Sequence, residues 1–330
     1  MARAVGSKTS VIVRQEYVWG TVDATSNNVD NHLLPVRDCS LTSSMNNFQS
    51  DTIDATRAVL GLGNGNRAVQ GSISMDLYPE GLELFFKYLL GDTVTTTGSG
   101  DPYTHVIKGT AETMEGLTIE KGFTNISRYF LYKGCRINSM TIDIVQEGFH
   151  GVTFDFVGKD ETVTETGNAT LHDNETQIST SDGMTGYNCT VSVGGSQQSN
   201  VKSGNINITN NIETDGYVLG SQFRASVEYS KRECSGEFTM FFEDTTLYEL
   251  YTAGTETSVV FNFTDNGTKS LNINFPAVKL SGDAPSINST SGVDLTMKFN
   301  AKYDSSEATD VIFTVVNGQA TVEGDPDNGS

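Results

Sequence analysis

The side chains that most often carry out chemistry are few in this chain and lie far apart. Its 330 residues include four histidines and four cysteines. No His-Glu-x-x-His motif and no Cys-x-x-Cys pair occurs, so the ligand spacing of a zinc site and a small disulfide framework are both missing. We therefore expect no metal site, and we expect the cysteines to be reduced, partly buried thiols. The eight residues are His32, His105, His150, His172, Cys39, Cys135, Cys189 and Cys234.

Motifs for phosphate binding and for nucleophilic catalysis are also missing. The run from Gly61 to Asn66, Gly-Leu-Gly-Asn-Gly-Asn, has closely spaced glycines. It opens a predicted strand and not a helix, so it predicts a β-turn and no dinucleotide site. Carboxylate pairs such as Glu80 and Glu83 are explained by a solvated face or a helix start. The sequence therefore predicts no catalytic residue, no cofactor and no enzyme activity.

Charge and hydropathy indicate a folded protein that does not bind nucleic acid through its phosphates. The formal net charge is −20, from 21 Lys and Arg against 41 Asp and Glu, which is the wrong sign for binding phosphates. The acidic excess serves either solubility or a passage that DNA crosses without sticking, and both interpretations remain open. The chain has no run of ~18 apolar residues. Its amino end lacks the apolar centre of a signal peptide, so we expect a protein that stays off membranes in the cytoplasm.

The sequence contains two similar copies of the elements that must position any functional surface. The segments that begin at Gly71 and Gly236 both read as an alternating strand followed by a short amphipathic helix, 165 positions apart. Gly151 and Gly292 begin a second similar pair at an offset of 141. The difference of 24 residues predicts an insertion within 92–116, and the second copy has 255–257 at that place. Repeated surfaces favour repeated contacts, so this pattern is typical of an assembling protein.

Strands with a period of two dominate each copy, and Thr, Val, Ile, Phe and Tyr are frequent between turns. Met140, Ile142 and Ile144 share one predicted face, while Thr141 and Asp143 share the other. The same alternation over 151–156, 271–275 and 293–301 predicts antiparallel sheets that are packed on one side and wet on the other.

A short helix flanks each predicted sheet. In the first copy, Leu82, Phe85, Phe86 and Leu89 form an apolar stripe within 79–91. In the second copy, the stripe is Leu247, Leu250 and Tyr251, with Asp244 as a candidate cap and Gly254 as the stop.

The fold class is thus mostly β, with two tandem β-sandwich or barrel domains and one short flanking α-helix in each. The first domain covers 1–160 and includes the insertion 92–116. A polar connector over 161–186 leads to the second domain, 187–318, and 319–330 form a mobile tail. The connector and the insertion lack apolar alternation, so we expect both to be cut first by protease.

Several segments resemble the tail tube (major tail) proteins of long-tailed bacteriophages. The resemblance covers most of 10–318 and depends on strand patterning rather than on a chemical motif. The segments are Tyr17-Val-Trp-Gly-Thr-Val with Leu34-Pro, Gly71 to Leu82, Gly116-Leu-Thr-Ile-Glu-Lys-Gly-Phe123, Tyr129 to Ile144 and Gly151 to Lys159.

The resemblance implies that sheets of neighbouring subunits join into rings, which stack into a tube that carries the genome during ejection. The implied location is the phage tail, assembled in the host bacterial cytoplasm with other tail proteins. Double-stranded DNA passes without specific binding. The wet face is then a candidate lumen lining, or alternatively an outer solvent face; its residues are Thr141, Asp143, Thr153, Asp155, Asp294 and Thr296. The insertion is a candidate ring-stacking loop, represented by Asp92, Asp101, Tyr103 and His105.

The copy number of the domain sets the expected ring. Tail tubes of this family are six-fold when each chain supplies one domain, so a chain with two domains implies a trimer with pseudo-six-fold symmetry. If the repeat is only an echo of β-patterning, six chains form the ring. The alternative from another class is an exported cell-surface or carbohydrate-binding β-sandwich protein, for which an export signal is expected.

Overall fold

The computed structural model describes residues 3–22, 31–54, 56–91, 94–110, 115–165, 171–172, 175–178, 182–265, 267–287 and 292–320. In these residues the chain is mostly β, as the sequence predicts. The two α-helices are α1 (Glu83–Leu90) and α2 (Thr246–Thr252). No described helix is long and apolar enough to cross a membrane.

Strands occupy both halves of the chain, with short 3-10 helices between some of them. The first half contains η1 (Gly6–Lys8), β1 (Thr9–Glu16), β2 (Asn31–Leu33), β3 (Val36–Cys39), β4 (Thr42–Gln49), β5 (Leu62–Asp76), β6 (Val94–Thr97), β7 (Tyr103–Lys108), β8 (Gly116–Phe123), η2 (Thr124–Ile126), β9 (Arg128–Ile144), β10 (Gly151–Gly158), β11 (Asp160–Glu165) and β12 (Glu175–Gln177). The second half contains η3 (Gly186–Asn188), β13 (Cys189–Val193), β14 (Ser196–Gln198), β15 (Val201–Thr209), β16 (Glu233–Phe241), β17 (Glu256–Thr264), β18 (Ser270–Gly282), β19 (Asp294–Ala301) and β20 (Ile312–Asn317).

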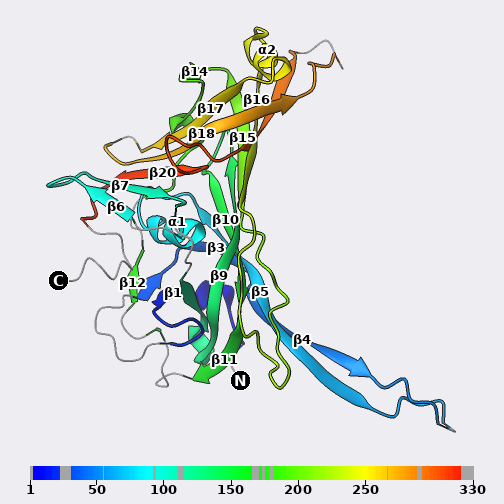
Figure 1. The fold of residues 1–330 in the computed structure, drawn as a ribbon. Helices are drawn as coiled ribbons and strands as arrows, with labels where there is room; N and C mark the ends of the chain where they lie inside the picture. Colours follow the sequence, from blue (N-terminus) through cyan, green and yellow to red (C-terminus); the bar gives the residue numbers. More distant parts are fainter. Residues whose placement is uncertain are drawn as a thin grey trace.

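One antiparallel sheet runs through both halves of the molecule (Figure 1). Its strands follow the order β4, β5, β10, β9, β15, β16, β19 and β18, with β3 beside β5 as the continuation of β4. The two halves meet where β9 pairs with β15, with Ile142 opposite Ile206. The central sheet is therefore continuous across the middle of the chain.

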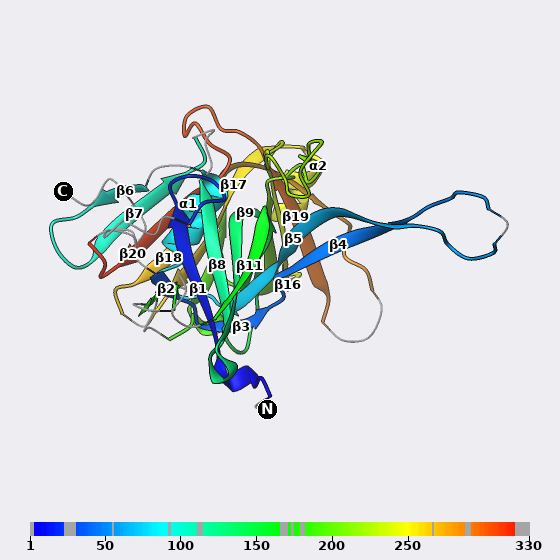
Figure 2. The same cartoon turned by 90° about the horizontal axis from the view of Figure 1, so that it is seen from below.

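The long strand β9 also belongs to a second layer. Its first residues pair with β8 on one side and with β11 on the other, and β8 in turn pairs with β1. Figure 2 shows β1, β8, β9 and β11 side by side. In the second half, β13, β17, the start of β18 and β20 make the corresponding layer. Apolar side chains of the two layers face each other and form the core.

Helix α1 fills the space on the packed side of the central sheet. Phe85 stacks on Phe154 of β10 with ring centroids 4.8 Å apart, and Phe86 stacks on Phe313 of β20 at 4.4 Å. The predicted stripe is buried, but so is the rest of the helix, because β7 covers its other side. The helix is capped by Gly91, whose positive φ of 70° suits glycine.

Helix α2 is less covered than α1. Leu247 is buried, whereas Leu250 and Tyr251 are only half-buried. The N-cap position is Thr245 and not Asp244 as predicted, although Asp244 Oδ1 accepts a hydrogen bond from the Thr246 amide, the first of the helix, at 2.9 Å. The sequence pattern therefore predicts both helices, and the surrounding strands decide how deeply each is buried.

Strand registers in the two halves repeat at the offset seen in the sequence. Val36 lies opposite Met75, and Val201 lies opposite Met240, which are both displaced by 165 positions. In each half a register shift follows directly, between 36 and 38 in the first and between 201 and 203 in the second. A β-bulge is an extra residue at a defined place in a strand, so two at matching places are a strong structural likeness.

The insertion differs from its prediction. Residues 94–108 form the hairpin β6–β7, and β7 pairs with β20 over six residues, with Ile107 opposite Phe313. His105 and Ile107 are buried while their neighbours on β7 are half-buried, so this segment is packed and is not the unpacked loop that was predicted. The strands of the hairpin are therefore packed, whereas its turn at 98–102 is exposed, and early cleavage of the insertion by protease stays a prediction.

Two other expectations on local structure also change. Gly63 and Gly65 lie inside β5 and Gly61 directly precedes it; Leu62 pairs with Gln49, so the chain reverses farther out, between 50 and 61. The connector contains β11 and β12, and β12 is parallel to β2. The last ten residues of the predicted tail lie outside the described residues. The boundaries of the two predicted domains stay a prediction.

Candidate assembly surfaces

One side of the central sheet is polar across six strands, from β5 through β10, β9, β15 and β16 to β19; we call it the polar face. It arises because alternate residues of each strand point away from the core. Its members are Ser72, Ser74 and Asp76; Thr153 and Asp155; Ser139, Thr141 and Asp143; Ser203, Asn205 and Asn207; Ser235, Glu237 and Thr239; and Asp294, Thr296, Lys298 and Asn300.

All six residues predicted from alternation lie on the polar face. Thr153 is opposite Thr141 in the β9–β10 ladder, so the first-half residues are direct neighbours. Asp294 and Thr296 lie on β19, which two strands, β15 and β16, separate from β9. The structure thus brings the six onto a single surface, and whether that surface lines a lumen stays a prediction.

Hydrogen bonds between neighbouring strands tie the polar face together. Asn205 Nδ2 donates to Asp143 Oδ1 at 2.8 Å across the junction of the two halves. Ser139 Oγ donates to Asp155 Oδ2 at 2.6 Å, and Lys202 Nζ of β15 reaches past β16 to Asp294 Oδ2 of β19 at 2.8 Å. Such cross-strand pairs each contribute about 0.2–1 kcal/mol. The carboxylates are therefore held in place while they stay exposed.

Sequence reasoning missed the residues of β15 and β16 on this face. The signal for β15 was available, because Ile206 and Ile208 alternate with Asn205 and Asn207. Glu237 also lies on the polar face, and it brings the exposed or half-exposed carboxylates there to five, with Asp76, Asp143, Asp155 and Asp294. Three of the five lie in the first half.

The central sheet has an open edge at each end. At one end, β3 and β4 pair with β5 alone in the described chain. Ser40 donates its amide to Ser72 O, so alternate residues such as Ser43 direct their N–H away from β5. At the other end, Leu280 to Gly282 of β18 pair with β19 and with no other described strand. Open edges present unpaired donors and acceptors that invite pairing with another chain.

A long hairpin, built from β4 and the first part of β5, extends far from the body of the molecule; we call it the arm, residues 42–70 (Figures 1 and 2). Large apolar side chains are exposed along it, including Ile53 at 97% and Leu62 at 76%. The full set is Met45, Phe48, Ile53, Val59, Leu60 and Leu62. An exposed apolar group of this size on a projecting element is typical of a contact surface.

The corresponding hairpin of the second half, residues 210–232, lies against the first half instead. Arg224 is buried, and its Nη1 donates to Gly158 O at 2.7 Å and to Val69 O at 3.3 Å. Tyr217 Oη donates to Arg67 O at 2.7 Å. The two hairpins therefore occupy matching places in the two halves, and only the first projects.

The predicted ring-stacking residues have different surroundings. Asp101 is exposed in the turn of the β6–β7 hairpin, and Tyr103 is half-buried on β7. His105 is fully buried: its Nδ1 lies 2.9 Å from Thr96 Oγ1 and its Nε2 lies 3.1 Å from Asn317 Oδ1. Asp92 lies outside the described residues. Of the three described residues, Asp101 is thus the most accessible to another subunit.

The burial of His105 predicts a pH dependence. Desolvation by burial lowers its pKa below the ordinary value of 6.5, against the opposing hydrogen bonds that His105 Nε2 donates to Asn317 Oδ1 and Gln319 O. As the pH falls through 6.5, the unfolded chain takes up a proton that the folded chain resists, so stability decreases. We expect His105→Gln to cost about 1 kcal/mol at pH 7.5 and to flatten the stability profile between pH 7 and pH 5. His150, whose pKa is also lowered, keeps part of the slope.

Urea unfolding of dilute, unassembled protein at several pH values measures this effect. The matched control is His172→Gln, because His172 is a half-exposed histidine. If the slopes of His105→Gln and of the parent chain agree between pH 7 and pH 5, His105 contributes nothing to the pH dependence.

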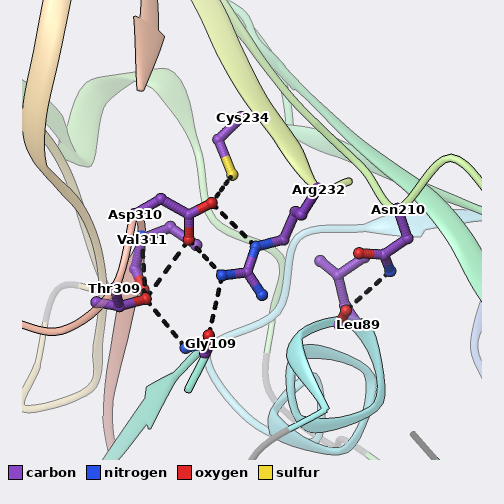
Figure 3. A network of polar contacts seen from close by, with 8 residues as sticks. All are labelled: Leu89, Gly109, Asn210, Arg232, Cys234, Thr309, Asp310 and Val311. Carbon is purple, nitrogen blue, oxygen red and sulfur yellow. Dashed lines mark hydrogen bonds and ion pairs between the residues drawn. The ribbon is translucent and has the colours of Figure 1, made fainter. Parts of the chain in front are cut away.

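A polar network fastens the insertion to the second half (Figure 3). Arg232 donates through Nε to Asp310 Oδ2 at 3.1 Å and through Nη2 to Gly109 O at 3.1 Å. The Gly109 amide donates to Thr309 Oγ1 at 3.1 Å. Burial, and then the Asp310 carboxylate, keep the pKa of the Cys234 thiol well above its ordinary value. All four cysteines are free, as the sequence predicts.

A sheet with one packed side, one polar side and an open edge at each end is the construction of a β-protein that assembles with copies of itself. The model of the phage tail tube protein family matches residues 6–325, which is nearly the whole chain. The chain therefore belongs to the phage tail tube protein family, whose members are structural components of the phage tail. A comparison with curated proteins returned no match.

Proposed function

We propose that this chain forms closed rings that stack into a tail tube, and that double-stranded DNA crosses its lumen during ejection into the host. The central sheet with its two open edges carries the proposal. An edge strand at each end allows one copy to continue the sheet of the next, and ring closure leaves no edge exposed. Assembly takes place in the host cytoplasm together with other tail proteins.

The two halves are proposed to be two tube domains in tandem. Support comes from the equal offsets of paired residues: Met75 and Met240 differ by 165, and their partners Val36 and Val201 differ by the same number. Each half also places a short helix directly after the strand that contains this methionine. Three chains then supply six domains, and the ring is a trimer with pseudo-six-fold symmetry.

Averaged cryo-EM images of tubes assembled from the purified chain test this proposal. Three-fold symmetry with six similar domains around the lumen is the expected result, because the hairpins of the two halves differ. Six-fold symmetry with a whole chain in each sector contradicts the tandem arrangement while leaving the tube intact. Dispersed monomers under all assembly conditions contradict the tube itself.

The polar face is proposed to line the lumen. The packed side of the sheet is covered by α1 and the second layer, so only the polar side is left to face a channel. Its carboxylates outnumber its basic side chains, and a lining of this sign repels phosphate. DNA then slides without forming the multiple cation contacts that hold it on basic surfaces.

Reversing the charge of this lining is expected to slow ejection. The triple variant Asp143→Lys, Asp155→Lys and Asp294→Lys changes the charge of each chain by +6, while the positions are exposed and each substitution costs about 0.5 kcal/mol of stability. Phages that carry it are expected to assemble tails of normal length and to release DNA at least tenfold more slowly at low salt, with recovery as salt increases.

A second triple variant provides the control for charge alone. Glu147, Asp215 and Glu243 are exposed and lie off the polar face, so their replacement by lysine changes the charge equally. Equal slowing by both triple variants argues against a lumen position for the polar face. A tube structure with the three aspartates on the outer wall also contradicts it.

A further inference from the structure

The junction between the two halves of one chain has a counterpart position in the second half that no described strand fills. At this junction β9 pairs with β15, with Ser139 opposite Thr209. The side of β9 used here is the one that β8 occupies earlier along the strand, up to the pair of Leu117 and Cys135. Strand β15 therefore takes over an edge of β9 where β8 stops.

The second half has the same arrangement with the last strand missing. Strand β17 occupies the corresponding side of β18 up to the pair of Glu256 and Lys279. Beyond that pair, this side of Leu280 to Gly282 faces no described strand. A groove lies here, lined by Tyr251 of α2, Asp283 and Leu295. In the first half, the equivalent position is filled by β15.

Residue counterparts follow from the strand registers. Val152 is opposite Met75 and Leu295 is opposite Met240, so β10 corresponds to β19 with an offset of 143, which corrects the offset of 141 predicted from Gly151 and Gly292. Asp155 therefore corresponds to Lys298. Because Asp155 faces Ser139 and Lys298 faces Ser281, Ser281 is the counterpart of Ser139.

The missing strand has a counterpart as well. Strand β15 corresponds to β3 and β4 with an offset of 165, and both carry the register shift at the same place. Thr209 thus corresponds to Ser44. On this basis we propose that the open edge of β18 binds residues 39–44 of a second copy of this chain in antiparallel register, with Ser44 opposite Ser281 and Thr42 opposite Asp283. The inference rests on the proposed ring.

The chemistry of both edges suits this register. Asn210 donates its amide to Asn138 O, so Thr209 and Ser139 form a pair without mutual backbone bonds, and the same holds for Asp143. The counterpart of Asp143 is Pro285, which has no N–H to offer. Pro285 therefore lies at a position where the ladder requires no N–H donor. We call the proposed contact between β18 of one chain and residues 39–44 of the next the seam. The side chains of Ser44 and Ser281 then continue the polar face across it.

One carbonyl of the incoming strand is already engaged. Leu41 O accepts the Tyr132 hydroxyl at 3.0 Å within its own chain. The amides that point away from β5 are those of Cys39, Leu41 and Ser43, in the alternation that starts from Ser40. The seam ladder is thus expected to depend most on the peptide groups of Cys39 and Ser43.

Disulfide trapping in assembled tubes tests the register. In a Cys39→Ser background, the double variants Ser44→Cys with Ser281→Cys and Thr42→Cys with Asp283→Cys place thiols in directly opposed pairs. Opposed residues without backbone bonds have Cα atoms about 4.5 Å apart, which a disulfide can span. The control is Thr42→Cys with Ser281→Cys, a diagonal pair about 7–8 Å apart.

We expect mild oxidation to give covalent trimers from the first two variants, at least tenfold more than from the control or from single-cysteine variants. Tubes that cross-link best through the control pair, or through none of the three pairs, overturn the register while the tube proposal stands. Failure of the Cys39→Ser parent to form any ring or tube overturns the register together with the proposed function.

Discussion

Substitution of Ser43 by proline is expected to abolish ring formation while leaving the monomer folded. The Ser43 N–H points away from β5, so its loss breaks no bond of the β4–β5 ladder. Proline is tolerated on an edge strand for this reason. In the ring, however, the same N–H is expected to bond to β18 of the neighbouring chain, and the pyrrolidine ring occupies the place of the incoming carbonyl.

Each ring contains three such seams under the proposed arrangement, so the defect acts three times. Negative-stain images and sedimentation of the variant are expected to show at least a tenfold decrease in rings and tubes, with an unfolding midpoint close to that of the parent. Ser43→Ala keeps the N–H and is the matched control, with assembly expected to be unchanged. Normal tubes from Ser43→Pro contradict the use of this edge.

Removal of the arm is expected to separate ring formation from stacking. Ser44 is opposite Ala68 in a hydrogen-bonded position of the ladder, so residues 45–67 can be replaced by Asn-Gly, which closes the strands with a two-residue turn. The deleted part contains six exposed large apolar side chains and contributes nothing to the buried core. The variant is therefore expected to fold, to form rings and to form no tubes.

The expected size of the effect follows from the apolar area. Burial of one exposed Phe, Ile or Leu contributes about 1.5–3 kcal/mol. The triple variant Phe48→Ser, Ile53→Ser and Leu62→Ser, which keeps the backbone of the arm, is thus expected to weaken stacking by at least a thousandfold in association constant. Serine-to-alanine changes at Ser196 and Ser199, which are exposed and lie outside the arm, provide a control. Tubes of normal length from the deletion variant show that stacking depends on other segments, such as the β6–β7 turn with Asp101.

The hairpin 210–232 explains why only one arm per chain projects. Its Arg224 inserts between the carbonyl oxygens of Val69 and Gly158, and its Ile212 and Val227 pack with Val157. In the described chain, the arm contacts this hairpin only near its base, at Arg67 and Val69, and its outer part has no comparable partner. The arm residues that face solvent are thus expected to find their partner on a neighbouring ring, and arms then alternate around a pseudo-six-fold ring.

Local alternation along each strand was sufficient to predict the polar face. Successive side chains point to opposite sides of a strand, so Asp143, Asp155 and Asp294 had to lie away from Ile142, Phe154 and Leu295 once the segments were extended. Helical spacing of apolar residues likewise predicted both helices, with α2 beginning two residues after the candidate cap Asp244. The spacing of 165 between similar segments was also visible without a structure.

Tertiary structure decided which edges pair and which stay open. The residues of β7 read as a polar insertion because their partner, β20, lies about 200 positions away, and pairing over such a distance leaves no local trace. His105 was predicted on a stacking loop, and it is buried because Asn317 and Thr96 surround it. Likewise, nothing in the sequence of β18 indicates that, beyond Lys279, no described strand pairs with its outer edge. An edge is open only in relation to all other strands, whereas the face of a strand depends on its own backbone alone, and that difference separates what the sequence determines from what folding determines.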